Sequence, residues 1–322
     1  MKAYVYGANG AAITDVAKPA PKGTQVLVRV RACGLNRADL GMTKGHAHGS
    51  AGGAGTVLGM EWAGEIAEVG PQAKGVKAGD RVMGSGAAAF AEYTLADHGR
   101  LFRTPSNMNF EEAATLPVAL ATMHNAVVTN GALQPGQSVL IQGASSGVGL
   151  MALQIAKLKG ARIVIGSSTD ATRRGRLKDF GADLAVDSSD PGWVDQVLKA
   201  TGGEGVDLIV DQVSGKVANQ NLAATRIKGR IVNVGRLGGT HADFNFDLHA
   251  ARRINYIGVT FRTRSIEEIR EIFDEVRKDI WPAVESRKLQ LPIDKVFSFD
   301  DIGKAFERME ANKHLGKIVV TL

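Results

Sequence analysis

The sequence predicts an α/β protein of two domains, a β-rich barrel-like domain followed by a doubly wound parallel sheet. Two observations support this prediction. In the first hundred residues, short apolar runs are separated by glycine and proline turns, which is typical of a small barrel. Beyond them, apolar runs alternate with helical patterns, at residues 139–141, 162–165, 207–210 and 230–234. Strands that alternate with helices form parallel sheets with both faces covered.

The barrel-like domain contains five expected strands, at residues 2–6, 25–32, 64–69, 80–83 and 91–94. Residues 39–58 are rich in glycine and alanine, so we expect a long loop there. A loop of this length either shapes a functional site or is a surface connector, and the sequence leaves both open. His46 and His48 lie in it without a third metal-ligating residue nearby, which favours solvated histidines over a metal site.

The domain boundary is expected near Thr122, where a helix at residues 122–129 leads into the sheet domain. We therefore assign residues 1–122 to the first domain and 123–261 to the second. The last strand of the sheet domain is expected at residues 254–259.

The end of the chain is expected to return to the first domain. Ser265 and Glu268 form a capping box that starts a helix. A second helix is expected at residues 300–312 and a closing strand at 317–322. Residues 262–322 should therefore complete the first domain.

Composition excludes several classes of protein. The chain has 322 residues, 44% of them hydrophobic, which is enough for two cores. Its single cysteine, Cys33, excludes a disulfide framework and suits a reducing cytosol. We find no signal peptide and no run of membrane-spanning length, so we expect a cytoplasmic protein. The net charge of +6 is scattered without an aromatic-basic signature, so we expect no nucleic-acid partner.

The segment 139–150 predicts the site of a dinucleotide cofactor. A buried strand runs into a helix through a glycine turn, which places free N–H groups at the positive end of the helix dipole. The turn departs from a strict G-x-G-x-x-G pattern, so an ordinary strand-to-helix turn is the alternative. The residues expected to bind the cofactor here are Ala144, Ser145, Ser146, Gly147, Val148 and Gly149.

The residues after the second strand of the sheet domain predict NADPH. Ser167 and Ser168 lie where the cofactor ribose is expected and are neutral, whereas a site specific for NAD would carry an acidic residue at the strand end. Arg173 and Arg174 open a basic helix, and guanidinium groups suit the oxygens of a 2′-phosphate. A solvated basic face is the alternative.

Two further segments are candidates for the cofactor site. Val234, Gly235 and Arg236 follow a strand at the edge of the sheet where such folds bind ligands, although a glycine at a strand end is often only a turn. Phe261 and Arg262 either border the cleft or cap the helix that follows, and the sequence favours neither.

The order of the motifs resembles the medium-chain dehydrogenase/reductase superfamily over essentially the whole chain. The motifs that carry the resemblance are residues 34–40 (GLNRADL), 58–64 (LGMEWAG), 79–82 (GDRV), 144–149 (ASSGVG) and 316–319 (GKIV). The resemblance implies a GroES-like β-barrel catalytic domain and a Rossmann NADP(H)-binding domain. It also implies a homodimer, because members commonly pair subunits through the last strand of the sheet.

The sequence departs from the zinc-dependent branch of that superfamily. Asn36 stands where those enzymes carry a cysteine, Met60 where they carry a histidine, and Val118 near the position of their remaining cysteine. These residues do not make a catalytic zinc site. The chain therefore resembles the zinc-free quinone oxidoreductase branch, typified by zeta-crystallin. That resemblance implies that Asn36 and Thr122 are polar groups near the nicotinamide. The alternative is that each side chain only caps a local turn or helix.

The expected function is reduction of quinones or α,β-unsaturated carbonyl compounds by NADPH without zinc. A conjugated acceptor spreads the incoming charge, whereas a plain ketone without a Lewis acid does not. The alternatives of the same fold are an enoyl-thioester reductase and a zinc-free alcohol dehydrogenase. From another class, a nucleotide-bound RNA-binding or structural protein would bind the cofactor without turnover.

Overall fold

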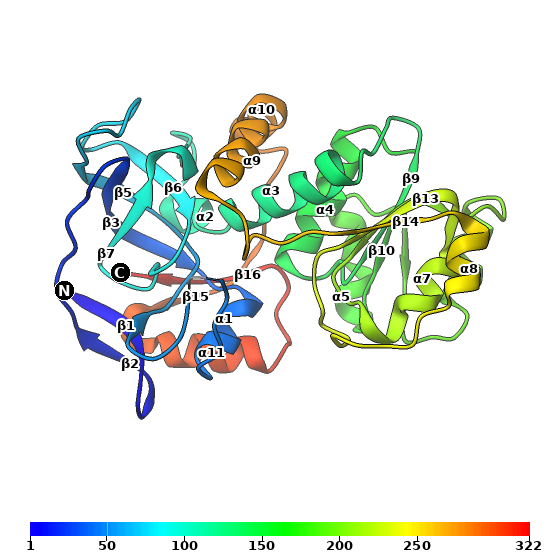
Figure 1. The fold of residues 1–322 in the computed structure, drawn as a ribbon, viewed down its shortest axis with the longest axis horizontal. Coiled ribbons are helices and arrows are strands. Elements are labelled where there is room, and N and C mark those ends of the chain that lie inside the picture. The colour runs from blue at the N-terminus through cyan, green and yellow to red at the C-terminus, as the bar shows by residue number, and fades with distance from the viewer. Residues whose placement is uncertain (50) are drawn as a thin grey trace. The chain divides into compact units, whose positions relative to one another are not determined.

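The computed structural model describes residues 1–49 and 51–322, and the chain divides into two compact units (Figure 1). The first unit comprises Met1–Ala121 and Phe261–Leu322, and the second comprises Thr122–Thr260. The division falls inside helix α3 (Pro117–His124), which continues as a π-helical segment, Asn125–Asn130. This helix starts earlier than the expected residue 122, because proline is favoured in the first turn of a helix, where its missing N–H costs nothing.

The first unit is built on an antiparallel strand, β3, that pairs with three neighbours. Its main sheet has the order β15-β16-β3-β5-β6-β8, with β7 also paired to β3, and a small sheet has the order β2-β1-β4. The bounds are β1 (Lys2–Gly7), β2 (Gly10–Asp15), β3 (Gln25–Gly34), β4 (Thr56–Val57), β5 (Glu61–Val69), β6 (Arg81–Ser85), β7 (Tyr93–Asp97), β8 (Leu101–Arg103), β15 (Ile293–Ser298) and β16 (Lys317–Thr321). Because β16 pairs with β3, the end of the chain lies in the first unit.

Helices complete the first unit around a core that includes Trp62, Phe90 and Phe306. They are α1 (Arg37–Met42), α2 (Phe110–Ala113), α9 (Ile266–Asp279), α10 (Trp281–Glu285) and α11 (Ile302–Glu310). The capping box of α9 forms as predicted, since Ser265 Oγ accepts from the Glu268 N–H at 3.2 Å. Helix α1 and strand β4 take up the two ends of the segment for which the sequence predicted only a loop.

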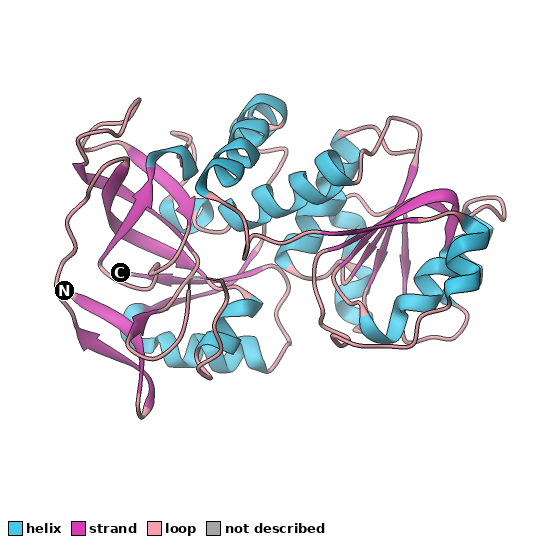
Figure 2. Ribbon diagram, viewed as in Figure 1, coloured by secondary structure: helices cyan, strands magenta, loops and turns pink. Residues whose placement is uncertain are grey.

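The second unit is a parallel six-stranded sheet with helices on both sides (Figure 2). Its strand order is β11-β10-β9-β12-β13-β14, so the order reverses between β9 and β12. The strands are β9 (Ser138–Gln142), β10 (Ile163–Ser167), β11 (Leu184–Val186), β12 (Val206–Asp211), β13 (Thr225–Asn233) and β14 (Asn255–Gly258). The helices are α4 (Gly147–Leu158), α5 (Ala171–Gly175), α6 (Trp193–Ala200), α7 (Ala218–Ala224) and α8 (Phe246–Arg252).

A separate apolar core fills the second unit, with Leu140, Ile165 and Ile209 on its central strands. The parallel sheet confirms the predicted α/β fold class, and the strand order is that of a doubly wound nucleotide-binding fold. Among the described residues, no helix is both long enough and apolar enough to cross a bilayer.

Candidate active site

The glycine turn between β9 and α4 is held by the cap of the helix. Ser146 is the N-cap, and its Oγ accepts from the Gly149 N–H at 3.1 Å and donates to the Gly143 carbonyl at 3.0 Å. A Cβ at Gly149 would lie 2.7 Å from the Ala144 backbone, so only glycine lets the helix pack this closely. The N–H groups of Gly147 and Val148 have no partner within the helix and suit an anion.

The two predicted ribose residues are both buried, but their hydroxyls have different partners. Ser167 is fully buried, and its hydroxyl donates to Gln142 Oε1 at 2.6 Å and accepts from the Gly143 N–H at 3.0 Å. That hydroxyl therefore braces the turn. Ser168 Oγ lies 3.0 Å from Ser145 Oγ, which brings two predicted cofactor residues together. Of Ser167 and Ser168, Ser168 is therefore the better placed to contact a cofactor.

The predicted arginines gather at the carboxyl end of β10. Asp170 caps α5 by accepting from the Arg173 N–H at 2.8 Å, and this hydrogen bond holds the pKa of Asp170 below its usual value. Arg173 Nε lies 3.6 Å from Asp170 Oδ1. Arg174 Nη1 donates at 2.9 Å both to the Ser168 carbonyl and to Asp187 Oδ2, so Arg174 braces the strand end. Arg173 and Arg174 therefore both lie at the strand end where the sequence predicts a phosphate.

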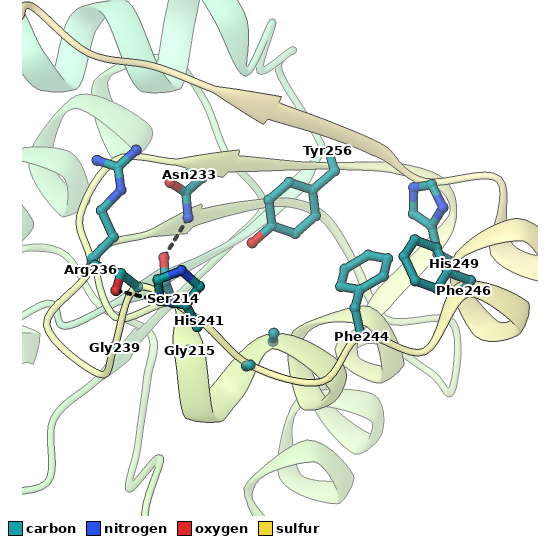
Figure 3. Close-up of a pocket in the computed structure, with 13 residues that line it drawn as sticks. Ser214, Gly215, Asn233, Arg236, Gly239, His241, Phe244, Phe246, His249 and Tyr256 are labelled. Atoms are coloured by element: carbon teal, nitrogen blue, oxygen red, sulfur yellow. Dashed lines mark hydrogen bonds between the residues drawn. The ribbon is translucent and has the colours of Figure 1, made fainter.

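A cavity of about 460 Å³ opens at the carboxyl ends of β12, β13 and β14 (Figure 3). Its polar wall includes Arg236 together with Asn233, which donates to Ser214 Oγ. Its apolar wall is aromatic, with the Phe244 ring 5.8 Å from that of Tyr256. The Tyr256 hydroxyl points into the cavity in Figure 3, and burial raises its pKa, so it is a neutral donor. The cavity can accept a planar group with a polar edge.

Val234 and Gly235 lie next to this cavity in the chain, between Asn233 and Arg236, which line it. Their N–H groups donate to the Asp211 carbonyl at 2.7 and 3.1 Å, which curls the chain over the end of β12. A Cβ at Gly235 would meet the Gln212 carbonyl at 2.6 Å, so the close approach requires glycine. The predicted segment 234–236 is therefore a tight turn at the carboxyl edge of the sheet, and its Arg236 lines the cavity.

Four polar residues of the first unit form a buried group that we call the Lys317 cluster: Asn36, Asp39, Glu61 and Lys317. Lys317 and Glu61 are 4% and 0% exposed and form an ion pair. Lys317 Nζ donates to Asn36 Oδ1 at 3.0 Å, and Asn36 Nδ2 donates to Glu61 Oε1 at 3.0 Å. The second Glu61 oxygen accepts from the Val118 N–H at 3.0 Å, in the first turn of α3.

Asp39 is the remaining member of the cluster and is fully buried. Its Oδ2 accepts from the Asn36 N–H at 2.7 Å, and no hydrogen-bond partner of Oδ1 is found among the described residues. Burial raises the pKa of Asp39 to about 7, with the charge of Glu61 adding to the effect and that of Lys317 opposing it. Asp39 therefore changes its protonation state near neutral pH.

The residues of the Lys317 cluster do not fit a catalytic zinc ion. The fold brings Asn36 and Val118, two positions singled out by the resemblance, to the same carboxylate. However, the Asn36 oxygen faces an ammonium group, and Val118 contributes only its backbone N–H. In the part of the chain that the structure describes, no group of three His, Cys, Asp or Glu side chains is arranged to hold a metal.

The other predicted residues are spread over both units. Thr122 is half-buried in α3 and belongs to the second unit, whereas Asn36 belongs to the first. Phe261 and Arg262 precede α9 in an irregular segment. A Cβ at Gly49 would lie 3.1 Å from the Arg262 carbonyl, so the glycine-rich loop packs against this segment. His46 and His48 line a hollow of about 240 Å³ beside α1.

Sequence reasoning did not assign roles to Asp39, Glu61 and Lys317. A signal was present, because Lys317 begins an apolar closing strand and Glu61 begins a strand that also contains the buried Trp62. Charged residues in buried strands are rare unless paired. The sequence does not say which charge pairs with which, so the network emerges only in the fold.

Comparisons with known proteins agree with this architecture. Residues 22–106 match the family described as alcohol dehydrogenase GroES-like domain, and residues 147–278 match the family described as zinc-binding dehydrogenase. Quinone oxidoreductase of Homo sapiens is 28% identical over 312 residues, which cover 96% of this chain and 92% of that protein.

A second relative is much longer than this chain. A phenolphthiocerol/phthiocerol polyketide synthase protein of Mycobacterium tuberculosis is 31% identical over 312 residues, which cover 96% of this chain and only 14% of that protein. Among solved structures, the CurK enoyl reductase superposes with a TM-score of 0.86 at 26% identity and covers 99% of both chains.

Proposed function

Because the chain belongs to the medium-chain dehydrogenase/reductase superfamily, in its quinone oxidoreductase-like branch, we propose that it is a zinc-independent, NADPH-dependent oxidoreductase. In this proposal it transfers hydride to quinones or α,β-unsaturated carbonyl compounds. The observation that carries it is the ammonium group of Lys317, which lies buried against Glu61 and Asn36 beside Val118. A conjugated acceptor suits such a site because delocalisation spreads the charge that a metal would otherwise stabilise.

The proposed cofactor site runs along the carboxyl edge of the sheet in the second unit. The N–H groups of Gly147 and Val148, next to Ser146, suit the pyrophosphate. The 2′-phosphate is assigned to Ser168 and Arg173, because a neutral hydroxyl and a charged guanidinium can both donate hydrogen bonds to phosphate oxygens. The nicotinamide half is assigned to residues 234–236 and to the segment with Phe261 and Arg262. When bound, NADPH supplies the hydride.

In this proposal, the chain's own polar groups at the reacting centre orient the acceptor and the nicotinamide. Asn36 and Thr122 are assigned to hydrogen bonds with the acceptor and the nicotinamide. The glycine-rich segment at residues 41–55 begins in the last turn of α1, and its Gly49 lies against Arg262, which supports a role in shaping the acceptor site over that of a loose connector.

An enoyl-thioester reductase is the second candidate function. Two findings favour it, the similarity to a polyketide synthase and the superposition on the CurK enoyl reductase. A zinc-free alcohol dehydrogenase would need a Ser, Tyr or His proton relay, and neither Asn36 nor Thr122, the residues assigned to the reacting centre, is one of these. A nucleotide-bound RNA-binding or structural protein would retain the cofactor without oxidising it.

A homodimer is part of the proposal. Strand β14 is the edge of its sheet, and the nearby Phe246 on α8 is a large apolar side chain that is 74% exposed. An open edge of this kind is a hazard unless it is paired or covered. A cytoplasmic location is also proposed, since the one cysteine, Cys33, is buried and unpaired.

Oxidation of NADPH measured against a panel of acceptors tests the function. The panel contains quinones, simple enones, enoyl thioesters and saturated ketones, with NADH run in parallel. Turnover of quinones and enones without added metal is the expected result. Preference for enoyl thioesters would select the second candidate. No oxidation with any acceptor, despite tight NADPH binding, would contradict an enzymatic role.

A further inference from the structure

The charges of the Lys317 cluster fix the orientation of the Asn36 side-chain amide. Its oxygen faces the Lys317 ammonium and its nitrogen faces the Glu61 carboxylate, each at 3.0 Å. A half-turn of the amide would place its NH₂ group against the ammonium and its oxygen against the carboxylate, and both contacts would be repulsive. Because Lys317 and Glu61 are almost completely buried, water screens these forces little.

The two charges are themselves held by the central sheet of the first unit. Glu61 begins β5 and Lys317 begins β16, and both strands pair with β3. Gly34 at the end of β3 is the register partner of Glu61, and a Cβ there would lie 2.6 Å from Glu61 Oε1. The glycine therefore makes room for the carboxylate. Asn36 is therefore framed by β16, β3 and β5, three adjacent strands of the main sheet, and not by a flexible loop.

The Asn36 amide keeps hydrogen-bonding capacity beyond the cluster. Its nitrogen has two hydrogens, and one is donated to Glu61. For the other, the part of the chain that the structure describes offers only the Gly34 carbonyl at 3.5 Å, which is at the limit of a hydrogen bond. The ammonium at the amide oxygen also polarises the amide and strengthens its N–H as a donor. Asn36 is half-buried, so this donor can reach a ligand.

We propose that Lys317 is a positioning residue for the reduction, holding the Asn36 amide with Glu61 so that its second N–H is donated to the carbonyl oxygen of the acceptor. This inference rests on the proposed function. It also accounts for the burial of the pair, because replacing a buried ion pair by apolar side chains is often neutral or stabilising. A purely structural contact at this place would not need two charges.

A double-mutant cycle on kcat/KM for the acceptor tests the inference. The variants are N36A, K317M and N36A/K317M, with K295M on the neighbouring strand β15 as the matched control. We expect K317M to lower kcat/KM at least tenfold, to leave NADPH affinity within twofold, and to have less than a twofold effect in the N36A background. If K317M does not fold, E61Q/K317M, which removes both charges of the ion pair, replaces it in the same cycle.

A second readout does not depend on activity. The side-chain NH₂ resonances of Asn36 are assigned by their loss in N36A, and their exchange with water is measured by NMR. We expect faster exchange in K317M and no change in K295M. Independent, multiplicative losses in the cycle, or unchanged Asn36 resonances in K317M, would overturn the positioning role. If wild type reduces no acceptor, the proposed function fails, whereas the resonances still decide how Asn36 is held.

Discussion

Replacing Asp39 by asparagine should change how the stability of the first unit depends on pH. Asp39 is fully buried, and burial raises its pKa from 3.8 to about 7. An asparagine has the same shape and can still accept from the Asn36 N–H, which Asp39 Oδ2 does at 2.7 Å. The variant therefore removes the titratable carboxyl group while it keeps the hydrogen bond from the Asn36 N–H.

The sign and the size follow from the difference between the folded and unfolded pKa. From about pH 4 to about pH 7, the folded protein holds a proton on Asp39 that the unfolded chain has released. Wild-type stability therefore falls across this window relative to D39N, and the loss is complete above pH 7. About three pKa units at 1.36 kcal/mol each amount to about 4 kcal/mol, on the order of the largest effects of single substitutions.

Hydrogen exchange of backbone amides in β3 and β5 measures this effect, because it reports on opening of the first unit alone. The protection of D39N relative to wild type, corrected for intrinsic exchange at each pH, should rise from pH 4 to pH 7 and then level off. D300N is the control, since Asp300 is exposed on the same unit. A difference that stays flat from pH 4 to pH 8 would show that Asp39 is ionised throughout, and the reasoning from burial would be refuted.

Four further predictions concern the cofactor, the metal and the assembly. R173A should weaken NADPH binding about ten- to a hundredfold, because one charged hydrogen bond is lost, and NADH binding should be affected far less. R176A is the control. Equal losses for both cofactors would contradict the assignment. G149A should weaken both cofactors because its Cβ would meet the Ala144 backbone at 2.7 Å, whereas G303A, with open space around it, should bind normally. Elemental analysis of active protein purified without chelator should find less than stoichiometric zinc, and about one zinc per chain, lost together with activity, would contradict this. Sedimentation at micromolar concentration should give a dimer that F246E dissociates, and a wild-type monomer would rule out the β14 interface.

Local signals in the sequence were sufficient for the fold class and for several elements. The apolar runs of β9, β10, β12 and β13 predicted a parallel sheet, because strands buried on both faces are continuously apolar. The capping box at Ser265 placed the start of α9, because capping depends on residues three positions apart. The same local logic missed the strands β2, β4, β8, β11 and β15 and placed the start of α3 too late, because tertiary pairing and a proline decided those elements.

The sequence predicted a role for the glycine turn, and the family resemblance implied one for Asn36, but only the tertiary structure decided what surrounds them. Lys317 and Asn36 are 281 positions apart, and no pattern along the chain pairs them. The antiparallel register on both sides of β3 brings Lys317 and Glu61 together and excludes water, and burial makes the two charges constrain a neighbouring amide. Likewise, the sequence does not distinguish Ser167 from Ser168, and only the packing of β10 against the turn directs the Ser167 hydroxyl to Gln142 and the Ser168 hydroxyl to Ser145. Hydrogen bonds between distant residues depend on how the strands assemble, which is why the chemistry of this site was decided by the fold.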